Sequence, residues 1–415
     1  MSLAGRSLRV LFLTESFHPV LGGGEAHILD LGRRLVASGW EAEVVTRRSG
    51  ATWPPVEMLD GIRVVRVPPA GPARRGKYLM APWAMAALLR ERRRFDVLVV
   101  RGTRVLGLPG ILAARALAKP VIWQAEVNGE MSGEIYTWGT PLDRPWPRRA
   151  VRGLTRARNL LMRDADAFVA MSGQIADELS RQGVPREKVH WIPHGVDLGR
   201  FRPATEAEKA GRRRELGLPG AGVIVSYTGR LLRGKGLEIL LQAFALLASR
   251  DPSLHLLLVG SGAGQSLSVE DELRRRAGEP GLEGRVTFAG RVADVAPYLG
   301  ASDVFAFPSL FEALGLSLVE AAACGLACVG SRTGGIVDVI EDGVSGLLAE
   351  PGDPAELSAK LQALSANPEL RQSMGGRARR LIEKRFDVED SVARYRSLFA
   401  EVARRGGSAL GLLRP

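Results

Sequence analysis

Cysteine is nearly absent from this sequence of 415 residues, which contains only Cys324 and Cys328. Both stand in a stretch rich in alanine and glycine, with no histidine and no second cysteine pair beside them. The sequence therefore excludes a disulfide framework and a zinc site of cysteine and histidine ligands. It fits a reducing compartment.

Long hydrophobic runs are also missing. No stretch of about 18 apolar residues lacks charge, so we expect no membrane-spanning helix. Residues 1–17 have too short an apolar run for a signal peptide, and no small-residue cleavage site follows them. These absences predict a cytoplasmic protein. The composition, 46% hydrophobic and 25% charged, is that of a soluble globular protein. The length suits two domains of about 200 residues.

Acidic residues are scarce only in the first half of the chain. Residues 1–200 contain 30 Lys and Arg against 19 Asp and Glu, whereas residues 201–415 contain 27 against 26. One interpretation is that the first half alone meets an anionic partner. The other is compositional, because Arg greatly outnumbers Lys throughout.

Two consecutive series of short apolar runs, each run followed by a turn and a helical pattern, divide the sequence. The first series is 8–14, 41–46, 62–67, 96–101, 120–125, 166–171 and 189–193. The second is 223–229, 255–260, 285–290, 303–309, 327–331 and 345–350. Such alternation predicts parallel sheets joined by right-handed crossovers. We predict an α/β protein of two facing Rossmann-like, doubly wound domains with a cleft between them, and ligands at the carboxyl ends of the strands.

The domain boundaries follow from a polar segment punctuated by proline and glycine. Residues 198–222 have the composition of a linker with one short helix. We assign residues 1–197 to an N-terminal domain and residues 198–390 to a C-terminal domain. After Asp353 the pattern is helical to about Arg405, and we expect a last helix within 391–415 to cross back to the first domain.

The segment 308–320 carries the strongest chemical signal. A strand ends there, a loop presents Glu312, and a helix begins near Gly315. The free N–H groups of Leu316 and Ser317 at the helix start can hold a diphosphate. Glu320 lies one and a half turns further and can reach the vicinal hydroxyls of a ribose. The alternative is two surface glutamates that flank an ordinary helix.

Two cations after the strand at 223–229 favour the chemical interpretation. Arg230 and Lys235 would neutralise a diphosphate as it leaves. The same stretch imitates the G-x-x-x-x-G-K of a P-loop, but Gly236 stands where Ser or Thr must hold magnesium. An ATPase is therefore a weak alternative.

Two further glycine-rich turns could approach a ligand. Gly23 and Gly24 follow a strand and open a helix, so their backbone can contact a phosphate or a sugar. Residues 260–264 read G-x-G-x-G, which differs from the dinucleotide fingerprint, and no helix begins directly on them. A dehydrogenase is a second weak alternative.

Taken together, these motifs resemble glycosyltransferase family 4, retaining enzymes with the GT-B fold, over nearly the whole chain. The matching residues are Gly22–Glu25, Gly195-Val196-Asp197, Gly229-Arg230, Lys235, Gly290, Asp303, Pro308-Ser309, 312–320 and Gly334-Gly335. The resemblance implies a nucleotide-diphosphate sugar, such as a UDP- or GDP-sugar, as the donor.

The resemblance also implies a role for each matching residue. Arg230 and Lys235 would contact the donor diphosphate, and the N–H groups of Leu316 and Ser317 would bind phosphate. Glu312 would lie near the donor sugar and Glu320 on the ribose. We predict Glu312, Arg230 and Lys235 as the catalytic set.

The chain departs from the family pattern after the strand at 120–125. Where the family commonly has a histidine, this sequence has Glu126, with Asn128 and Glu130 close by. These residues are expected near the acceptor or the donor sugar, and the exchange signals a different substrate. The usual asparagine before Gly-Val-Asp is His194, which we interpret as a turn residue.

The reaction is expected to occur on one face of the sugar, with the leaving phosphate helping to deprotonate the acceptor hydroxyl. We see no Asp-x-Asp motif, so we expect no metal and no cofactor. A nucleotide-sugar epimerase and a catalytically silent sugar-nucleotide-binding protein remain alternatives.

The acceptor is expected to be a glycan or a lipid-linked molecule on the basic N-terminal domain. Basic residues interleaved with apolar ones at 146–163, and arginines at 90–94, could bind anionic lipid on the inner face of a membrane. The alternative is a helix packed on one side and solvated on the other. Nucleic acid is not an expected partner, since no nucleic-acid-binding motif is evident.

Overall fold

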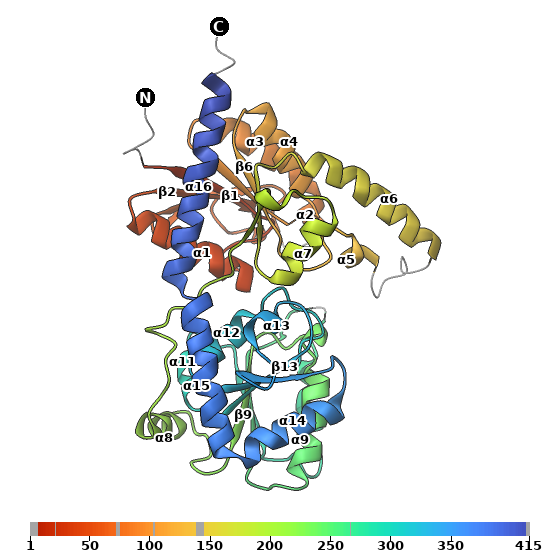
Figure 1. Ribbon diagram of the computed structural model, residues 1–415, viewed down its shortest axis with the longest axis vertical. Helices are drawn as coiled ribbons and strands as arrows, with labels where there is room; N and C mark the ends of the chain where they lie inside the picture. Colours follow the sequence, from red (N-terminus) through yellow and green to blue (C-terminus); the bar gives the residue numbers. More distant parts are fainter. Residues whose placement is uncertain are drawn as a thin grey trace. The chain divides into compact units, whose positions relative to one another are not determined.

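Two parallel sheets organise the chain, and each belongs to a separate compact unit. Unit 1 comprises Met1–Pro193 and Asp390–Pro415, and unit 2 comprises His194–Glu389. The computed structural model describes residues 7–20, 22–71, 75–102, 104–137, 145–265 and 267–411. The units divide at 193/194 and 389/390, where the sequence placed boundaries at 197/198 and 390/391. The predicted fold class, two α/β domains built on parallel sheets, is confirmed (Figure 1).

The strands of unit 1 lie in the order β3-β4-β2-β1-β5-β6-β7-β8. They are β1 (Arg9–Leu13), β2 (Glu41–Arg47), β3 (Val56–Leu59), β4 (Ile62–Val67), β5 (Val97–Arg101), β6 (Val121–Gln124), β7 (Ala167–Ala170) and β8 (Val189–Trp191). Every pairing is parallel except β3–β4. Such strands read as continuous apolar runs because helices cover both faces of the sheet.

The helices of unit 1 follow the strands as crossovers. They are α1 (Gly23–Ala37), α2 (Gly76–Leu79), α3 (Ala81–Glu91), α4 (Gly107–Ala116), α5 (Glu134–Thr137), α6 (Pro145–Met162), α7 (Gly173–Arg181) and most of α16 (Val388–Gly411). Chain order along the sheet reverses between β1 and β5. In doubly wound sheets the loops at this switch point hold the ligand.

β3 was not predicted. It pairs antiparallel with β4 at the edge of the sheet, and Val56 and Met58 are 45% and 65% exposed. A short edge strand with mixed polarity, directly after Pro54 and Pro55, gives no continuous apolar run that a sequence pattern could detect.

Unit 2 contains strands in the order β11-β10-β9-β12-β13-β14, all parallel. They are β9 (Ile224–Thr228), β10 (His255–Val259), β11 (Val286–Gly290), β12 (Val304–Phe307), β13 (Ala327–Ser331) and β14 (Gly346–Ala349). Here the chain order reverses between β9 and β12. The loops after these two strands, residues 229–236 and 308–315, therefore stand at the switch point of the sheet.

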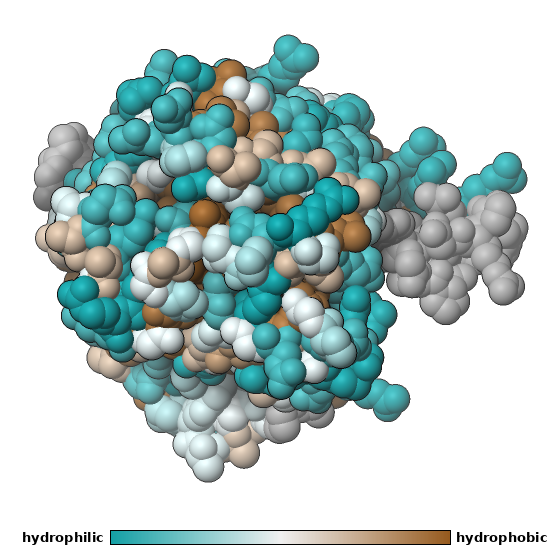
Figure 2. Space-filling model, turned by 90° about the horizontal axis from the view of Figure 1, so that it is seen from below, coloured by the Kyte–Doolittle hydropathy of each residue, from teal (hydrophilic) through white to brown (hydrophobic). Residues whose placement is uncertain are grey.

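The helices of unit 2 are α8 (Glu206–Glu215), α9 (Leu237–Ala248), α10 (Glu270–Ala277), α11 (Ala296–Gly300), α12 (Leu316–Ala323), α13 (Ile336–Val339), α14 (Pro354–Ala366) and α15 (Pro368–Arg385). Segment 198–222, interpreted from the sequence as a linker, lies within unit 2. The end of unit 2 seen in Figure 2 is mostly hydrophilic, with hydrophobic residues in small groups. Within the described part of the chain, every helix is too short or too polar to cross a bilayer.

Candidate functional site

The loop after β9 leaves the sheet through a glycine that no other residue could replace easily. Gly229 has φ +145°, and an added Cβ would lie 2.7 Å from the hydroxyl of Tyr227. That buried hydroxyl donates to the carbonyl oxygen of Arg230 at 3.1 Å, and the Tyr227 ring stacks on Phe307 of β12. The backbone at Arg230 is thus fixed by the core, while its side chain is exposed.

Lys235 and Glu312 meet across the two loops of the switch point. Lys235 Nζ lies 2.5 Å from Glu312 Oε2 and 5.8 Å from the centre of the Phe307 ring. The loop backbones are also bonded, because the Leu310 N–H donates to the Gly234 carbonyl at 3.0 Å. The structure therefore brings together two of the residues predicted as catalytic.

The conformation of Gly236 disfavours the Ser or Thr that a P-loop has at this position. This residue has φ +66°, and an added Cβ would lie 2.0 Å from the carbonyl oxygen of Pro308. A serine or threonine cannot occupy this position without moving the backbone. The glycine in the sequence is thus required by the close approach of the two loops.

Helix α12 begins with its N-terminus beside these loops. Gly315, the N-cap, has φ +91°, and its carbonyl accepts from the N–H groups of Leu318 and Val319. The N–H groups of Leu316 and Ser317 come before this first helical bond, so the helix itself offers them no acceptor. Such groups, with the helix dipole, form a site for an anion.

Glu320 lies in the second turn of α12 and is half-buried. Burial raises its pKa to about 7; Arg200 opposes this shift and Asp294 adds to it. Arg200 is itself paired with Asp294 at 2.8 Å. Glu320 therefore changes charge near neutral pH, and it can accept hydrogen bonds from hydroxyl groups once it is ionised.

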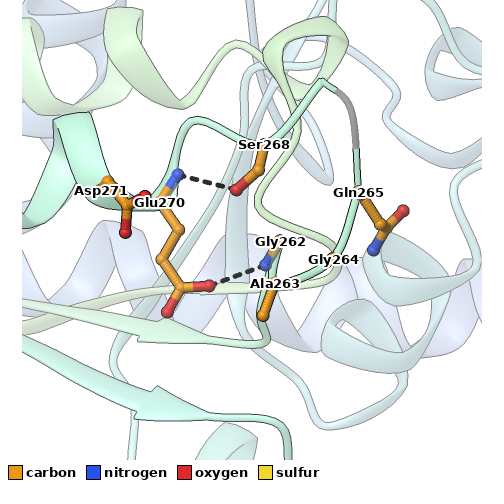
Figure 3. Close-up of a pocket in the computed structure, with 7 residues that line it drawn as sticks. All are labelled: Gly262, Ala263, Gly264, Gln265, Ser268, Glu270 and Asp271. Atoms are coloured by element: carbon orange, nitrogen blue, oxygen red, sulfur yellow. Dashed lines mark hydrogen bonds between the residues drawn. The ribbon is translucent and has the colours of Figure 1, made fainter.

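A depression of about 630 Å³ lies at the loop after β10, which is hydrogen-bonded to the loop that carries Arg230. Its lining comes from the loop after β10 and the start of α10, as Figure 3 shows: Gly262, Ala263, Gly264, Gln265, Ser268, Glu270 and Asp271. Glu270 accepts from the Gly262 N–H at 2.8 Å and from the Ser261 hydroxyl at 2.7 Å. Among the described residues, three backbone hydrogen bonds join this loop to segment 231–233.

This depression was not predicted from the sequence, although the glycine-rich run 260–264 was a signal for it. The same geometry rejects the dinucleotide fingerprint, because α10 begins only at Glu270. Gly260 has φ +140°, and an added Cβ would lie 1.8 Å from the Gly229 carbonyl. This glycine serves close packing between the two loops.

In unit 1, Gly23 and Gly24 open helix α1 after β1. Arg101, the last residue of β5, donates from Nη1 to the Gly24 carbonyl at 2.7 Å. A Cβ on Gly24 would lie 3.0 Å from Arg101 Nη2, whereas Gly23 has open space. Arg101 was not predicted from the sequence, and it joins the two loops of the unit 1 switch point.

Glu126 also contacts Arg101. The distance from Arg101 Nη2 to Glu126 Oε1 is 3.7 Å; the arginine side chain is 1% exposed and the glutamate 39%. Asn128 donates to Gln174 Oε1 at 2.8 Å. The exchange of the family histidine for Glu126 thus places a carboxylate next to a buried guanidinium that also holds the glycine loop.

Glu130 is buried and accepts a hydrogen bond from the Glu126 N–H at 3.2 Å. Burial raises its pKa to about 8, and the charge of Glu126 acts in the same direction. Glu178 holds the same loop, because its carboxylate accepts from the N–H groups of Gly129 and Ser132, both at 2.7 Å. The loop that presents Glu126 and Asn128 is therefore rigidly supported.

Comparison with known proteins gives the family. Residues 209–381 match the family model described as glycosyl transferases group 1, and residues 21–200 match the one described as glycosyltransferase family 4. The chain is 31% identical to a D-inositol 3-phosphate glycosyltransferase of Streptomyces bingchenggensis, over 92% of this chain and 85% of that protein. It is also 31% identical to the same-named protein of Geodermatophilus obscurus, over 95% and 89%.

Solved structures agree with this assignment. Sucrose-phosphate synthase of Thermosynechococcus elongatus has a TM-score of 0.78 and 25% identity, with 95% of this chain and all of that chain covered. Anabaena HepE in complex with UDP and glucose has a TM-score of 0.73 and 23% identity, with the same coverage. These are GT-B folds with two parallel-sheet domains. The chain therefore belongs to glycosyltransferase family 4 and is a glycosyltransferase.

Proposed function

We propose that this glycosyltransferase moves a hexose from a UDP- or GDP-sugar to a hydroxyl of a glycan or lipid-linked acceptor. The transfer retains the anomeric configuration and needs no metal. The observation that carries the proposal is the Lys235–Glu312 contact of 2.5 Å, at the switch point where α12 begins. Cation, carboxylate and helix N-terminus converge where a sugar diphosphate would be held.

In this mechanism the charged groups act on the leaving group. Arg230 and Lys235 stabilise the negative charge that develops on the diphosphate as the glycosidic bond breaks. Leu316 and Ser317 add two N–H donors to the phosphate. Glu312 orients Lys235 and faces the sugar, and the leaving phosphate accepts the proton of the acceptor hydroxyl on the same face.

The acceptor belongs to unit 1 in this proposal, beside Gly23, Gly24, Glu126 and Asn128. The relatives are named for D-inositol 3-phosphate. That phosphorylated polyol therefore joins glycans and lipid-linked sugars as an acceptor to test. We place the protein in the cytoplasm, peripheral to the inner face of a membrane.

A screen of UDP-, GDP- and ADP-sugars in the presence of EDTA tests the donor side. We expect one donor to raise the melting temperature and to be slowly hydrolysed without metal. Turnover that is lost in EDTA and restored by magnesium or manganese would refute metal independence. Donor conversion without an acceptor would indicate an epimerase, and binding without any turnover would indicate a silent binding protein.

The role of Lys235 is tested by substitution. Lys235→Ala should lower kcat by a factor of about 10²–10³, since the side chain acts mainly on transition-state charge. Arg233→Ala, in the same loop but exposed, is the matched control and should leave kcat nearly unchanged. A near-normal kcat for a folded Lys235→Ala protein would remove this assignment.

A further inference from the structure

Helix α6 has two faces of different chemistry, and one of them is buried. Thr155, Asn159 and Met162, at helical spacing, are 6%, 2% and 0% exposed. They attach α6 to the rest of unit 1, where the helix packs against α4 and α5. The opposite face is exposed to solvent as far as the described residues show, and we call it the free face; the N-terminal part of α6 projects from unit 1 (Figure 1).

The free face carries a stripe of apolar side chains. Positions 150, 154, 157 and 161 repeat with helical spacing and are Ala, Leu, Ala and Leu. Leu154 is 74% exposed, Leu161 is 48% exposed and the adjacent Leu160 is 62% exposed. Three exposed leucines on one helix leave apolar surface in water that a partner could cover.

A second stripe, of arginines, runs along the flank of the apolar one. Arg149, Arg152 and Arg156 are spaced by three and four residues, and all three are exposed. Within the described part of the chain no carboxylate pairs with them. The side chains of residues 145–148, which begin the predicted basic stretch, lie outside the described part.

The charge of the molecule supports the same conclusion. Unit 1 contains 34 Lys and Arg against 20 Asp and Glu, whereas unit 2 contains 23 against 25. Helix α4, which packs on α6, adds the half-exposed Leu112, and α3 adds Leu89 followed by the exposed Arg92 and Arg93. The apolar and basic groups are therefore concentrated in unit 1.

We propose that the free face of α6, Arg149 to Leu161, docks on the surface of an anionic lipid bilayer. An apolar stripe that enters the acyl boundary, beside arginines at the level of the headgroups, is the pattern of an interfacial helix. A second copy of the chain is a poor occupant, because two arginine stripes would repel each other.

The buried face of α6 joins this surface to the acceptor side. Arg158 donates to the Glu130 carbonyl at 2.7 Å, and Asn159 donates to the Met131 carbonyl at 2.7 Å. These bonds fix the loop that presents Glu126 and Asn128. A docked α6 would hold this loop near the bilayer, where a lipid-linked acceptor is found; this last step rests on the proposed function.

Sedimentation of the full-length protein with vesicles tests the docking. We expect binding to phosphatidylcholine vesicles that contain phosphatidylglycerol, and none to phosphatidylcholine alone. The double variant Arg152→Gln/Arg156→Gln should bind about thirtyfold more weakly, about fivefold for each arginine. The double variant Leu154→Gln/Leu161→Gln should bind the same vesicles at least about tenfold more weakly than the wild type.

Matched controls come from exposed positions of unit 2. Leu246→Gln replaces a leucine that is 48% exposed on α9, and Arg214→Gln/Arg250→Gln removes two exposed arginines. Neither should change vesicle binding. The proposal would be overturned if the controls lost as much vesicle binding as the α6 variants, or if the α6 variants bound as well as the wild type. It would also be overturned if the wild type did not bind the vesicles at low salt.

The two proposals fail separately. Donor-induced stabilisation and donor hydrolysis are measured without vesicles and should be unchanged in the α6 variants. If vesicle binding is absent while the donor response is intact, only the docking is wrong. If no donor is bound while vesicles are bound through α6, only the proposed function is wrong.

Discussion

A β-carbon at position 236 would lie 2.0 Å from the Pro308 carbonyl, in a backbone with φ +66°. We therefore predict that Gly236→Ser, which completes a P-loop consensus, lowers the free energy of unfolding by about 2 kcal/mol or more. It should also weaken donor binding, because Lys235 precedes it. Urea unfolding measures the first effect and a donor thermal shift the second.

Gly234→Ala is the control for that substitution. Gly234 lies in the same loop, has no heavy atom within 4 Å of an added Cβ and has no positive φ. The free energy of unfolding of Gly234→Ala should stay within about 0.5 kcal/mol of the wild-type value. Equal effects of the two substitutions would mean that the approach of the two loops does not constrain position 236.

Glu130 gives a prediction about pH. Its pKa is raised from 4.5 to about 8, so folding favours the protonated carboxyl. The stability from this group is complete below the unfolded pKa and is lost as the pH rises through about 8. Glu130→Gln does not titrate and can still accept from the Glu126 N–H. The variant should therefore gain stability relative to the wild type between about pH 5 and about pH 9.

Unfolding in urea across this range measures the difference. Glu41→Gln, at an exposed position in β2, is the control and should follow the wild-type curve. A constant offset between Glu130→Gln and the wild type at all pH values would show that Glu130 does not titrate between folded and unfolded states in this range.

Individual residues differ in how far the sequence revealed them. Lys235 and Glu312 were predictable, because each stands in a loop that follows a strand and leads to a helix, and the structure places them in contact. Arg101 was not, because one arginine at the end of an apolar strand usually points to solvent. Its burial depends on the long-range contact with Gly24, which local patterns do not contain.

At the scale of elements, α8 is fixed to the sheet by a buried ionic cluster. Arg213 Nη2 lies 2.5 Å from Asp303 Oδ2, and Lys209 Nζ lies 3.1 Å from Asp303 Oδ1. Asp303 also accepts from the Ile224 N–H at 2.7 Å. This cluster acts together with the buried side chains of Phe201 and Leu218 to fix segment 198–222 in unit 2.

Removing one charge of the cluster should lower the free energy of unfolding. Asp303→Asn leaves the buried Arg213 without its counter-charge, and we expect a loss of about 3–5 kcal/mol in the free energy of unfolding. Glu206→Gln removes the Lys209 partner, which is 90% exposed, and should cost less than about 0.5 kcal/mol. Chemical denaturation compares the two. Similar losses of unfolding free energy for the two variants would indicate that the cluster is hydrated.

The sequence located each predicted strand because buried parallel strands are continuous apolar runs. It failed where an element is short, polar or stabilised by distant groups. The edge strand β3 is one such element. The loop before α10 is another, since Glu270 and the backbone of segment 231–233 hold its described residues, 261–265 and 267–269.

At the scale of the whole molecule, the C-terminal helix completes unit 1. Phe399 packs edge-on against Phe12 of β1, with ring centres 6.3 Å apart, and against Trp40 at 6.4 Å. The ring centre of Tyr395 lies 5.5 Å from the ring centre of His27 in α1. Residues more than 350 positions apart in sequence thus share one core, so unit 1 needs both ends of the chain.

This arrangement predicts two separable unfolding transitions. Phe399→Ala should destabilise unit 1 by about 3–5 kcal/mol, because it leaves a cavity among buried aromatic side chains. The nucleotide of the donor should raise only the transition of unit 2, by about 2.7 kcal/mol at a hundredfold excess over Kd. Calorimetry of wild type and variant, with and without nucleotide, measures both shifts. Leu246→Ala, on an exposed position of α9, should move neither transition. If Phe399→Ala and the nucleotide shift one common transition, the two units unfold cooperatively, and the free energy of each is coupled to the other.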